Sequence, residues 1–486
     1  MALAFAFHFL APDARQARST FRCPGSLGAW ARSALCLWLE PGSAELFPSW
    51  REGILRLVHR SFVALCVLAL AVTAGATVYT SYATDREYSR LIDAGDRAAV
   101  ADQPFPALEA YTAAIALRPD SMLAYLKRGR IYKDQAELDS AARDLRRAAE
   151  LDPTATLPLE LLGDTYLAMG RYDRAADRFQ AYLSLDDRSP AVWYKLGLAQ
   201  YRSGYATKAV TAVERAVALD NTLAESQLLL GLCLRDTGQP ERARLPLERA
   251  TRLGPGLTAP REALAGVYAD LGDHSRAIDQ LEALAALDPT TPARFVALGL
   301  AHLRARRHEA AVLALSRAVE RFPNEPQIYG ALGRVWLDAA EQHDDAISLK
   351  KALEALTTAA AHADATSVVL TDLGVAWALA GDADKAERAF RQAVARSPVD
   401  PDAYLRLAGI IAAGNALEAR DLLIRYATLV GDERPIAPVA TDIAVYSLRA
   451  AQPAVALKWI DKAVEEAGEP PALARLRAQA LAALPH

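Results

Sequence analysis

The chain has 486 residues, more than one hydrophobic core needs, and this length predicts several domains or a repeat array. Hydrophobic residues make up 52% of the sequence, aromatic residues 7%, and the formal net charge is -4, so no global positive field attracts nucleic acid. The four cysteines are widely scattered, which argues against a metal site and against the disulfide framework of a small secreted domain.

The first part of the chain, residues 1–60, mixes Trp, Pro, Gly, Cys and Arg without a sustained hydrophobic period. We interpret it as a disordered N-terminal segment. An alternative hypothesis is that translation begins near Leu55 to Val58, at a codon other than AUG. The intact mass of the N-terminus decides between them, because peptides from residues 20–45 would exclude the late start.

Residues 61–80 carry no charged side chain and are long enough to cross a bilayer as one helix. Arg56 and Arg60 precede this stretch, and the small Lys/Arg excess on that side places the N-terminus in the cytoplasm. We therefore predict a transmembrane helix or signal anchor at 61–80. It passes once through the inner (cytoplasmic) membrane and leaves the rest of the chain outside the cytoplasm.

A cleaved signal peptide is the alternative interpretation of the same stretch. Small residues at 74–76 and 81–83 resemble cleavage sites. Cleavage would release a soluble periplasmic or secreted protein.

Residues 81–467 carry a repeat of 34 residues. One series of small residues consists of Gly95, Gly129, Gly163, Gly197, Gly231, Ala265, Gly299 and Gly333. A second series consists of Ala107, Ala141, Ala175, Ala209, Ala243, Ala277 and Ala311. The next step, from Gly333 to Gly374, is 41 residues, which indicates a single insert of 7 residues near 338–351.

Each repeat predicts two amphipathic helices, which we name helix A and helix B. In the second repeat, helix A spans about 122–135 and helix B about 138–151, with apolar residues at helical spacing on both. Gly129 and Ala141 predict the place where the two backbones approach most closely, and Leu145 is expected to meet the next helix A. Pro153 ends helix B because proline lacks an amide hydrogen and restricts the residue before it.

These residues resemble the signature of the tetratricopeptide repeat family. The fourth repeat matches it at Trp193, Leu196, Gly197, Ala209 and Ala216. The ninth repeat matches it at Leu373, Gly374, Ala386, Phe390, Ala393 and Pro398. The resemblance implies an all-α solenoid, a right-handed superhelix of about eleven repeats, followed by a capping helix within 468–486.

The resemblance also implies a non-catalytic scaffold or adaptor that binds other proteins or peptides in a groove lined by the A helices. We expect this scaffold to be presented at the cell envelope. The alternatives are a secreted soluble chaperone and a regulatory subunit of an envelope assembly or secretion complex. The predicted groove residues are Leu126, Arg130, Lys133, Tyr194, Leu198, Tyr201, Leu228, Leu232, Val296, Leu300 and Leu303. They are mostly apolar, which favours an amphipathic partner helix. Alternatively, the leucines pack between neighbouring helices.

The sequence contains no recognisable catalytic motif, so we expect no enzyme activity, cofactor or metal. A phosphate-binding loop and a nucleophile elbow are both missing from the sequence. His308 and Glu309 begin like a zinc motif, but Val312 stands where its second histidine would be. The insert is more simply a bend or a partner surface than a metal site.

Overall fold

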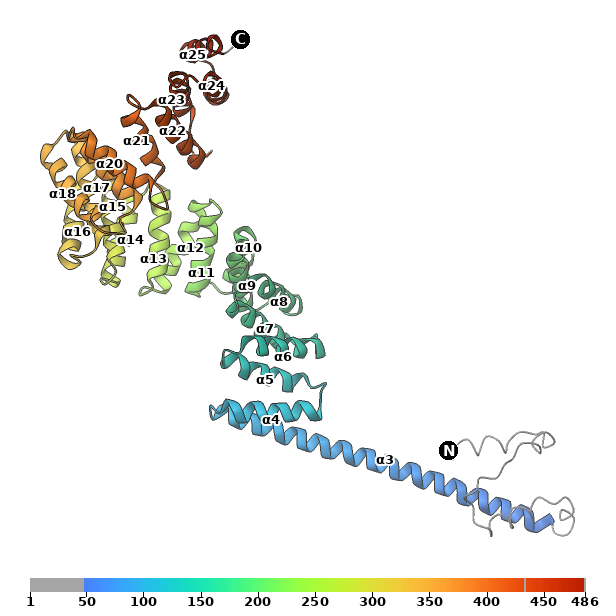
Figure 1. The fold of residues 1–486 in the computed structure, drawn as a ribbon. Coiled ribbons are helices and arrows are strands. Elements are labelled where there is room, and N and C mark those ends of the chain that lie inside the picture. The colour runs from blue at the N-terminus through green and yellow to red at the C-terminus, as the bar shows by residue number, and fades with distance from the viewer. Residues whose placement is uncertain (1–47, 432–433, 485–486) are drawn as a thin grey trace. The chain divides into compact units, whose positions relative to one another are not determined.

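The structure, a computed structural model, describes residues 48–431 and 434–484, with side chains described from residue 61. Within these ranges the chain forms 23 α-helices and no β-strand (Figure 1). Successive helices pack against each other in pairs, which confirms the predicted all-α solenoid of helical repeats. The handedness of the superhelix stays a prediction.

Eleven pairs of helices correspond to the repeats, and one helix follows them. The A helices are α3 (Pro48–Val100), α5 (Met122–Asp134), α7 (Thr156–Ala168), α9 (Pro190–Arg202), α11 (Ala224–Asp236), α13 (Thr258–Asp270), α15 (Pro292–Arg304), α17 (Pro326–His343), α19 (Ser367–Leu379), α21 (Pro401–Ile411) and α23 (Ala437–Arg449). The B helices are α4 (Pro104–Leu117), α6 (Leu138–Leu151), α8 (Tyr172–Leu185), α10 (Ala206–Leu219), α12 (Pro240–Leu253), α14 (His274–Leu287), α16 (His308–Arg321), α18 (Ala346–Ala360), α20 (Ala383–Val394), α22 (Ala416–Val430) and α24 (Pro453–Ala467).

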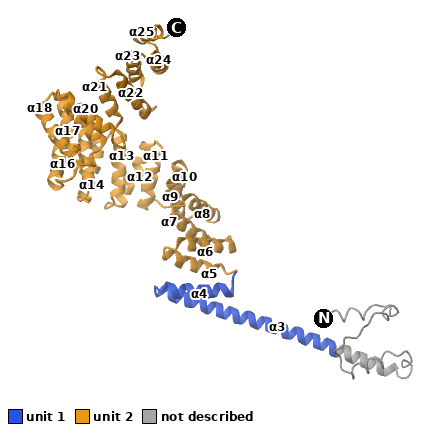
Figure 2. Ribbon diagram, in the orientation of Figure 1, with its two compact units in different colours: residues 1–119 blue, residues 120–486 orange. Residues whose placement is uncertain are grey.

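The chain divides into two compact units, residues 1–119 and residues 120–486 (Figure 2). In the described part of the first unit, α3 is a single helix of 53 residues that includes both the apolar stretch and the A helix of the first repeat. Residues 48–60, which we expected to be disordered, belong to this helix, so that boundary is corrected. The rest of the predicted disordered segment lies outside the described residues.

The small-residue series marks where each A helix contacts its B helix. A Cβ atom added at Gly163 would lie 2.5 Å from the ring of Phe179, and one added at Gly129 would lie 3.0 Å from Leu145 Cγ. At 2.5 Å the Phe179 ring would have to move, whereas at 3.0 Å Leu145 would have to shift by a few tenths of an ångström. Gly129 therefore lies against Leu145 of the same repeat, and Leu145 also belongs to the cluster that contains Leu162 and Tyr166 of the next A helix, as expected.

A second series of residues at the same 34-residue step forms the turns between helices A and B. Gly170, Gly204, Gly238 and Gly272 all have positive φ angles, of 69° to 84°. At the first of these turns, Arg171 N donates to Tyr166 O at 2.9 Å, which is the Schellman pattern that ends a helix with a left-handed residue. Glycine adopts this conformation without steric cost.

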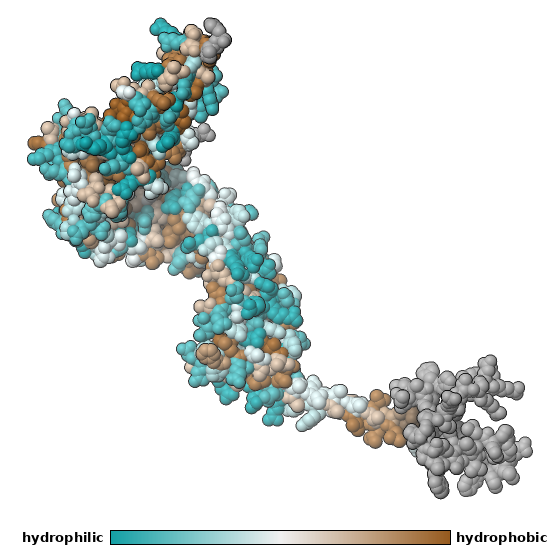
Figure 3. All heavy atoms as spheres, viewed as in Figure 1, coloured by the Kyte–Doolittle hydropathy of each residue, from teal (hydrophilic) through white to brown (hydrophobic). Residues whose placement is uncertain are grey.

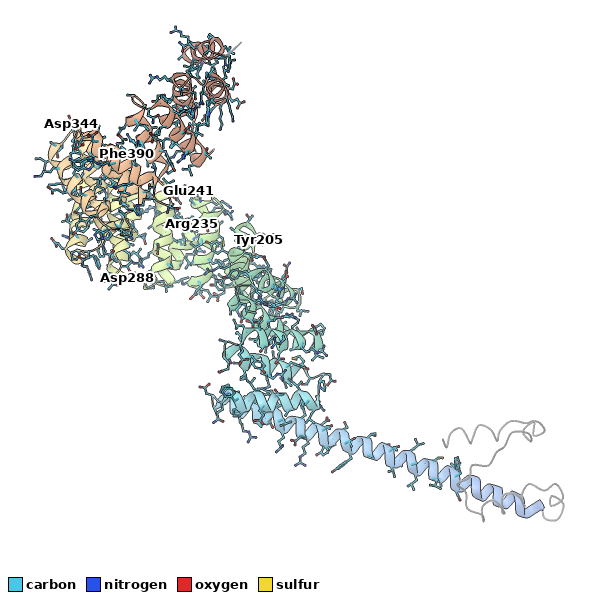
Figure 4. The ribbon with its side chains drawn as sticks, in the orientation of Figure 1. Tyr205, Arg235, Glu241, Asp288, Asp344 and Phe390 are labelled. Atoms are coloured by element: carbon cyan, nitrogen blue, oxygen red, sulfur yellow. The ribbon has the colours of Figure 1, made fainter. Side chains whose placement is uncertain are left out.

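The insert lengthens two helices of the eighth repeat instead of forming a loop. α17 has 18 residues, and α18 has 15. Asp344 lies at the turn between them with φ 49° (Figure 4). The Asp345 carboxylate caps α18 by accepting from the backbone nitrogens of Ile347 and Ser348.

The last helix, α25 (Pro471–Ala482), packs against the eleventh repeat. Its Leu473 and Ala480 are buried together with Ile460 and Ala463 of α24. An apolar face that would otherwise end the array is covered in this way.

Candidate protein-binding surface on the A helices

The predicted groove residues come from four A helices and fall into three groups. They are Leu126, Arg130 and Lys133 on α5; Tyr194, Leu198 and Tyr201 on α9 with Leu228 and Leu232 on α11; and Val296, Leu300 and Leu303 on α15.

The group on α9 and α11 forms one half-buried apolar surface. One core cluster, formed by buried residues of α10 to α14, packs against all five side chains: Tyr194, Leu198, Tyr201, Leu228 and Leu232. Each of these side chains keeps part of its area exposed. They therefore contribute to the core and also offer apolar area to a partner, so packing between helices and partner binding are compatible here.

The group on α15 packs against a different core cluster. Val296, Leu300 and Leu303 are half-buried beside the cluster that contains Ile328 and Val335 of α17. The structure thus brings the predicted apolar residues together within each group and assigns the two groups to separate clusters.

The group on α5 departs from the prediction at one residue. Leu126 is only 8% exposed and lies in the cluster that contains Leu162 and Tyr166 of α7, so its side chain is not available to a partner. Arg130 is exposed, and Lys133 is partly exposed. Of the three predicted residues on this helix, the two that a partner can reach are therefore cationic.

A chain of charges connects the A helices of the second, third and fourth repeats. Lys195 Nζ on α9 lies 2.8 Å from Glu160 Oε1 and 2.9 Å from Asp164 Oδ2 on α7. Lys133 Nζ lies 3.8 Å from the same Asp164 oxygen. Burial acts to lower the pKa of Lys195, but the hydrogen bonds to the two carboxylates outweigh it and raise that pKa. The sequence analysis did not predict this ion pair. The signal for it is the spacing of Glu160 and Lys195, which carry opposite charges and are 35 residues apart, one residue more than the repeat.

Polar groups at the C-terminal ends of α9 and α11 are also paired with each other. Tyr201 Oη donates to Asp236 Oδ2 at 2.6 Å, and burial together with this bond raises the pKa of Tyr201 to about 12. Arg235, at the end of α11 (Figure 4), pairs with the same aspartate at 2.8 Å. Among the described residues no group of three His, Cys, Asp or Glu side chains is placed to hold a metal ion.

The comparisons with known proteins agree with the repeat architecture. Family models described as tetratricopeptide repeat match residues 123–154, 161–224, 296–364 and 371–430. A model described as anaphase-promoting complex, cyclosome, subunit 3 matches residues 202–284. The small glutamine-rich tetratricopeptide repeat-containing protein 2 of Mycosarcoma maydis is 30% identical over 92 residues, which cover 19% of this chain and 26% of that protein.

Solved structures of helical repeat proteins are also similar to this chain. YrrB, described as a TPR protein with an unusual peptide-binding site, shares 22% identity with a TM-score of 0.36, covering 41% of this chain and 99% of its own. A tetratricopeptide repeat protein of Parabacteroides merdae shares 18% identity with a TM-score of 0.38, covering 51% and 99%. The Cut9-Hcn1 hetero-tetramer of the anaphase-promoting complex shares 14% identity with a TM-score of 0.38, covering 81% of this chain and 96% of that one.

Proposed function

The chain belongs to the tetratricopeptide repeat family, and from this premise we propose that it is a non-catalytic scaffold that binds segments of other proteins on its A helices and is held at the cell envelope by α3. Proteins of this family are interaction scaffolds, and the surface described above consists of half-buried apolar side chains and paired charges. The proposal therefore concerns recognition rather than chemistry.

The observation that carries the proposal is the half-buried apolar surface on α9 and α11. Leu198, Leu228 and Leu232 lie in one cluster, yet none of them is fully buried. Covering such area releases water and stabilises a complex by roughly 25 cal/mol for each Å² that is buried. An amphipathic partner helix supplies a matching apolar face.

The proposed attachment to a membrane is supported by the exposure of α3. Every residue from 61 to 86 is exposed, including Leu65, Leu68 and Leu70 at 61% to 68%. Figure 3 shows hydrophobic residues along α3 beside the grey atoms. By length and composition this helix can cross a membrane. Side chains of this kind need an apolar environment, and a bilayer supplies one.

The binding function is tested by placing charges on the proposed surface. We expect the double variant Leu232→Asp with Leu300→Asp to lose the proteins that a photo-crosslinking residue at Leu198 captures in intact cells, because a partner would have to desolvate both carboxylates. The matched control is Leu245→Asp with Leu313→Asp, on the B helices of the same repeats, where the leucines are 50% and 53% exposed. The control should keep every adduct.

Circular dichroism separates binding from folding in this experiment. The double variant should keep its helical content, since both leucines already reach solvent. If adducts persist in the double variant, or disappear equally in the control, the proposed surface is wrong. Loss of helical content would instead show that the leucines serve the core.

Membrane attachment is tested by alkaline carbonate extraction and protease protection of intact spheroplasts, together with the mass of the N-terminus. A signal anchor predicts an uncleaved chain in the membrane pellet with the repeats digested from outside. A mature N-terminus beyond residue 76, with the protein in the soluble fraction, would contradict the anchor and favour the secreted form.

A further inference from the structure

One junction in the array lacks the polar contact that joins the other repeats. From the second repeat to the eleventh, every other pair of consecutive repeats shares a side-chain hydrogen bond. These bonds are Arg146–Tyr166, Lys195–Glu160, Tyr201–Asp236, Tyr268–Glu248, His308–Asp338, Arg334–Asp372, Arg391–Glu418 and Arg420–Gln452. Between the sixth and seventh repeats, the described side chains form hydrogen bonds only within the connecting turn, at Asp288 (Figure 4). Elsewhere at this junction, ionisable groups approach only to 4.0 Å, at Arg294–Glu262 and His302–Glu282.

The apolar core is also divided at this junction. The cluster of the fourth to sixth repeats ends at Ala277 on α14, and the next one begins at Ala311 on α16. Between them, a small cluster of three buried residues joins α14 to α15, namely Ile278, Leu298 and Ala301. A junction with a divided core and no hydrogen bond outside its turn opens at a lower free-energy cost than its neighbours.

A buried histidine lies at this junction, at the position where the preceding repeat has a tyrosine. His302 follows the small residue of its repeat by three positions, as Tyr268 does. Tyr268 Oη donates to Glu248 Oε1 on the preceding B helix at 2.8 Å. His302 is 7% exposed, and because an imidazole is shorter than a phenol, its Nε2 lies 4.0 Å from Glu282, the equivalent residue of α14.

The surroundings of His302 suit a neutral ring better than a protonated one. Its Nδ1 is buried without a hydrogen-bond partner among the described residues. A neutral ring has one N–H to satisfy, whereas a protonated ring donates from both nitrogens. Burial lowers the pKa of His302 below its ordinary value; Glu282 on α14 opposes this shift, and Arg307 at the N-cap of α16 adds to it. α17 also packs against α15, and none of its described charged groups acts on the ring.

We propose that the junction between the sixth and seventh repeats is a hinge that opens in acid, and that protonation of His302 triggers the opening. When the junction opens, both ring nitrogens reach water, and the cost of burying a charge is removed. Leu198 and Leu232 of the proposed binding surface precede this junction, and Leu300 follows it. Opening therefore separates the two parts of that surface, and this regulatory consequence rests on the proposed function.

The pH window of the hinge follows from the direction of the pKa shift. The closed junction binds a proton on His302 less tightly than the open junction does, so acid favours opening. The closed form is most stable above about pH 6.5, the ordinary pKa of histidine, and loses stability as the pH falls from there to the lowered value. One proton changes the opening equilibrium by up to about tenfold between pH 7.5 and pH 5.5.

Hydrogen exchange of the full chain in detergent tests the hinge directly. Exchange is measured at about pH 7.5 and 5.5 and corrected for the pH dependence of the exchange chemistry itself. We expect the opening equilibrium at the amides of α14 and α15 to rise by up to about tenfold at the lower pH. The amides of α9 and α11 should change by less than about twofold, since contacts in a repeat array reach only neighbouring repeats.

Two variants and a matched control identify His302 as the trigger. His302→Gln introduces the neutral residue that Gln200 supplies at this position of the fourth repeat, and His302→Tyr introduces the residue found at Tyr268. Both variants should open equally at the two pH values, and the tyrosine variant tests the proposal if the glutamine variant alters folding. The control is His274→Gln, at a partly exposed residue that begins α14, and it should keep the full acid response.

An acid response that is absent from the unaltered chain, that persists in both His302 variants, or that is equally large in α9 and α11 would overturn the proposal. The exchange measurement needs no partner, so its outcome is independent of the proposed function. Photo-crosslinking from Leu198 and Leu300 in isolated membranes tests the regulatory consequence, and acid should weaken the adducts in the unaltered chain but not in His302→Tyr. Adducts that never form at either pH would remove the binding function and leave the hinge, whereas adducts that ignore the pH would remove its role in binding.

Discussion

Replacement of Phe390 by alanine is expected to destabilise the ninth and tenth repeats by about 3–5 kcal/mol. Phe390 lies on α20 (Figure 4), is 1% exposed, and shares a cluster with Tyr404 and Leu407 of α21. Its ring faces Gly374, where an added Cβ would lie 2.5 Å away. Because glycine has no side chain that can move into the space, the cavity cannot collapse from that side.

Urea unfolding and hydrogen exchange of the amides of α19 to α22 measure this effect. Exchange is the more direct readout, because repeat arrays open locally and contacts reach only neighbouring repeats. The control is Phe105→Ala on α4, where the ring is 80% exposed and the expected change is under about 0.5 kcal/mol. A change below about 1 kcal/mol for Phe390→Ala would contradict the packing described here.

Replacement of Arg128 by leucine is expected to destabilise the second repeat by about 3 kcal/mol. The Arg128 guanidinium on α5 donates to both oxygens of Asp144 on α6, at 2.6 and 2.9 Å, and the two side chains are 17% and 9% exposed. Without the arginine, the carboxylate stays buried and loses its charged partner. The loss of stability comes mainly from this uncompensated charge.

A double variant distinguishes this explanation from a simple loss of contact area. Arg128→Leu with Asp144→Leu should recover most of the lost stability, since a buried ion pair replaced by apolar residues is often neutral. Arg147→Leu breaks an exposed pair with Glu150, whose side chains are 49% and 55% exposed, and should change stability by less than about 0.5 kcal/mol. A double variant as unstable as Arg128→Leu would show that the buried charge is not the cause.

The repeat could be predicted from the sequence because it depends on local chemistry. The small residues at Gly129 and Ala141 set the register, and the predicted helices of that repeat agree with α5 and α6 to within one residue. The turn series could also have been found, since Gly170 and Gly204 follow the same step. Three other positions at this step, Asp102, Ala136 and Arg306, have φ angles of 54° to 59° and hide the pattern because none of them is glycine.

The proposed binding surface could be predicted only in part. Helical spacing shows which side of an A helix carries a residue, but it does not show how much of that side chain the next A helix covers. Leu126 and Leu228 hold equivalent positions in their repeats, yet Leu126 is buried with Leu162 whereas Leu228 stays half-buried.

The unbroken course of α3 has a mechanical consequence. From residue 48 to residue 100 the helix has 53 residues, about 80 Å at a rise of 1.5 Å for each residue, with no flexible linker between the apolar stretch and the first repeat. A force or a torque applied to the first repeat would therefore be transmitted along this continuous helix to the apolar stretch. In the membrane-anchored form proposed above, α3 would therefore hold the first repeat at a fixed height and a fixed rotation relative to the membrane.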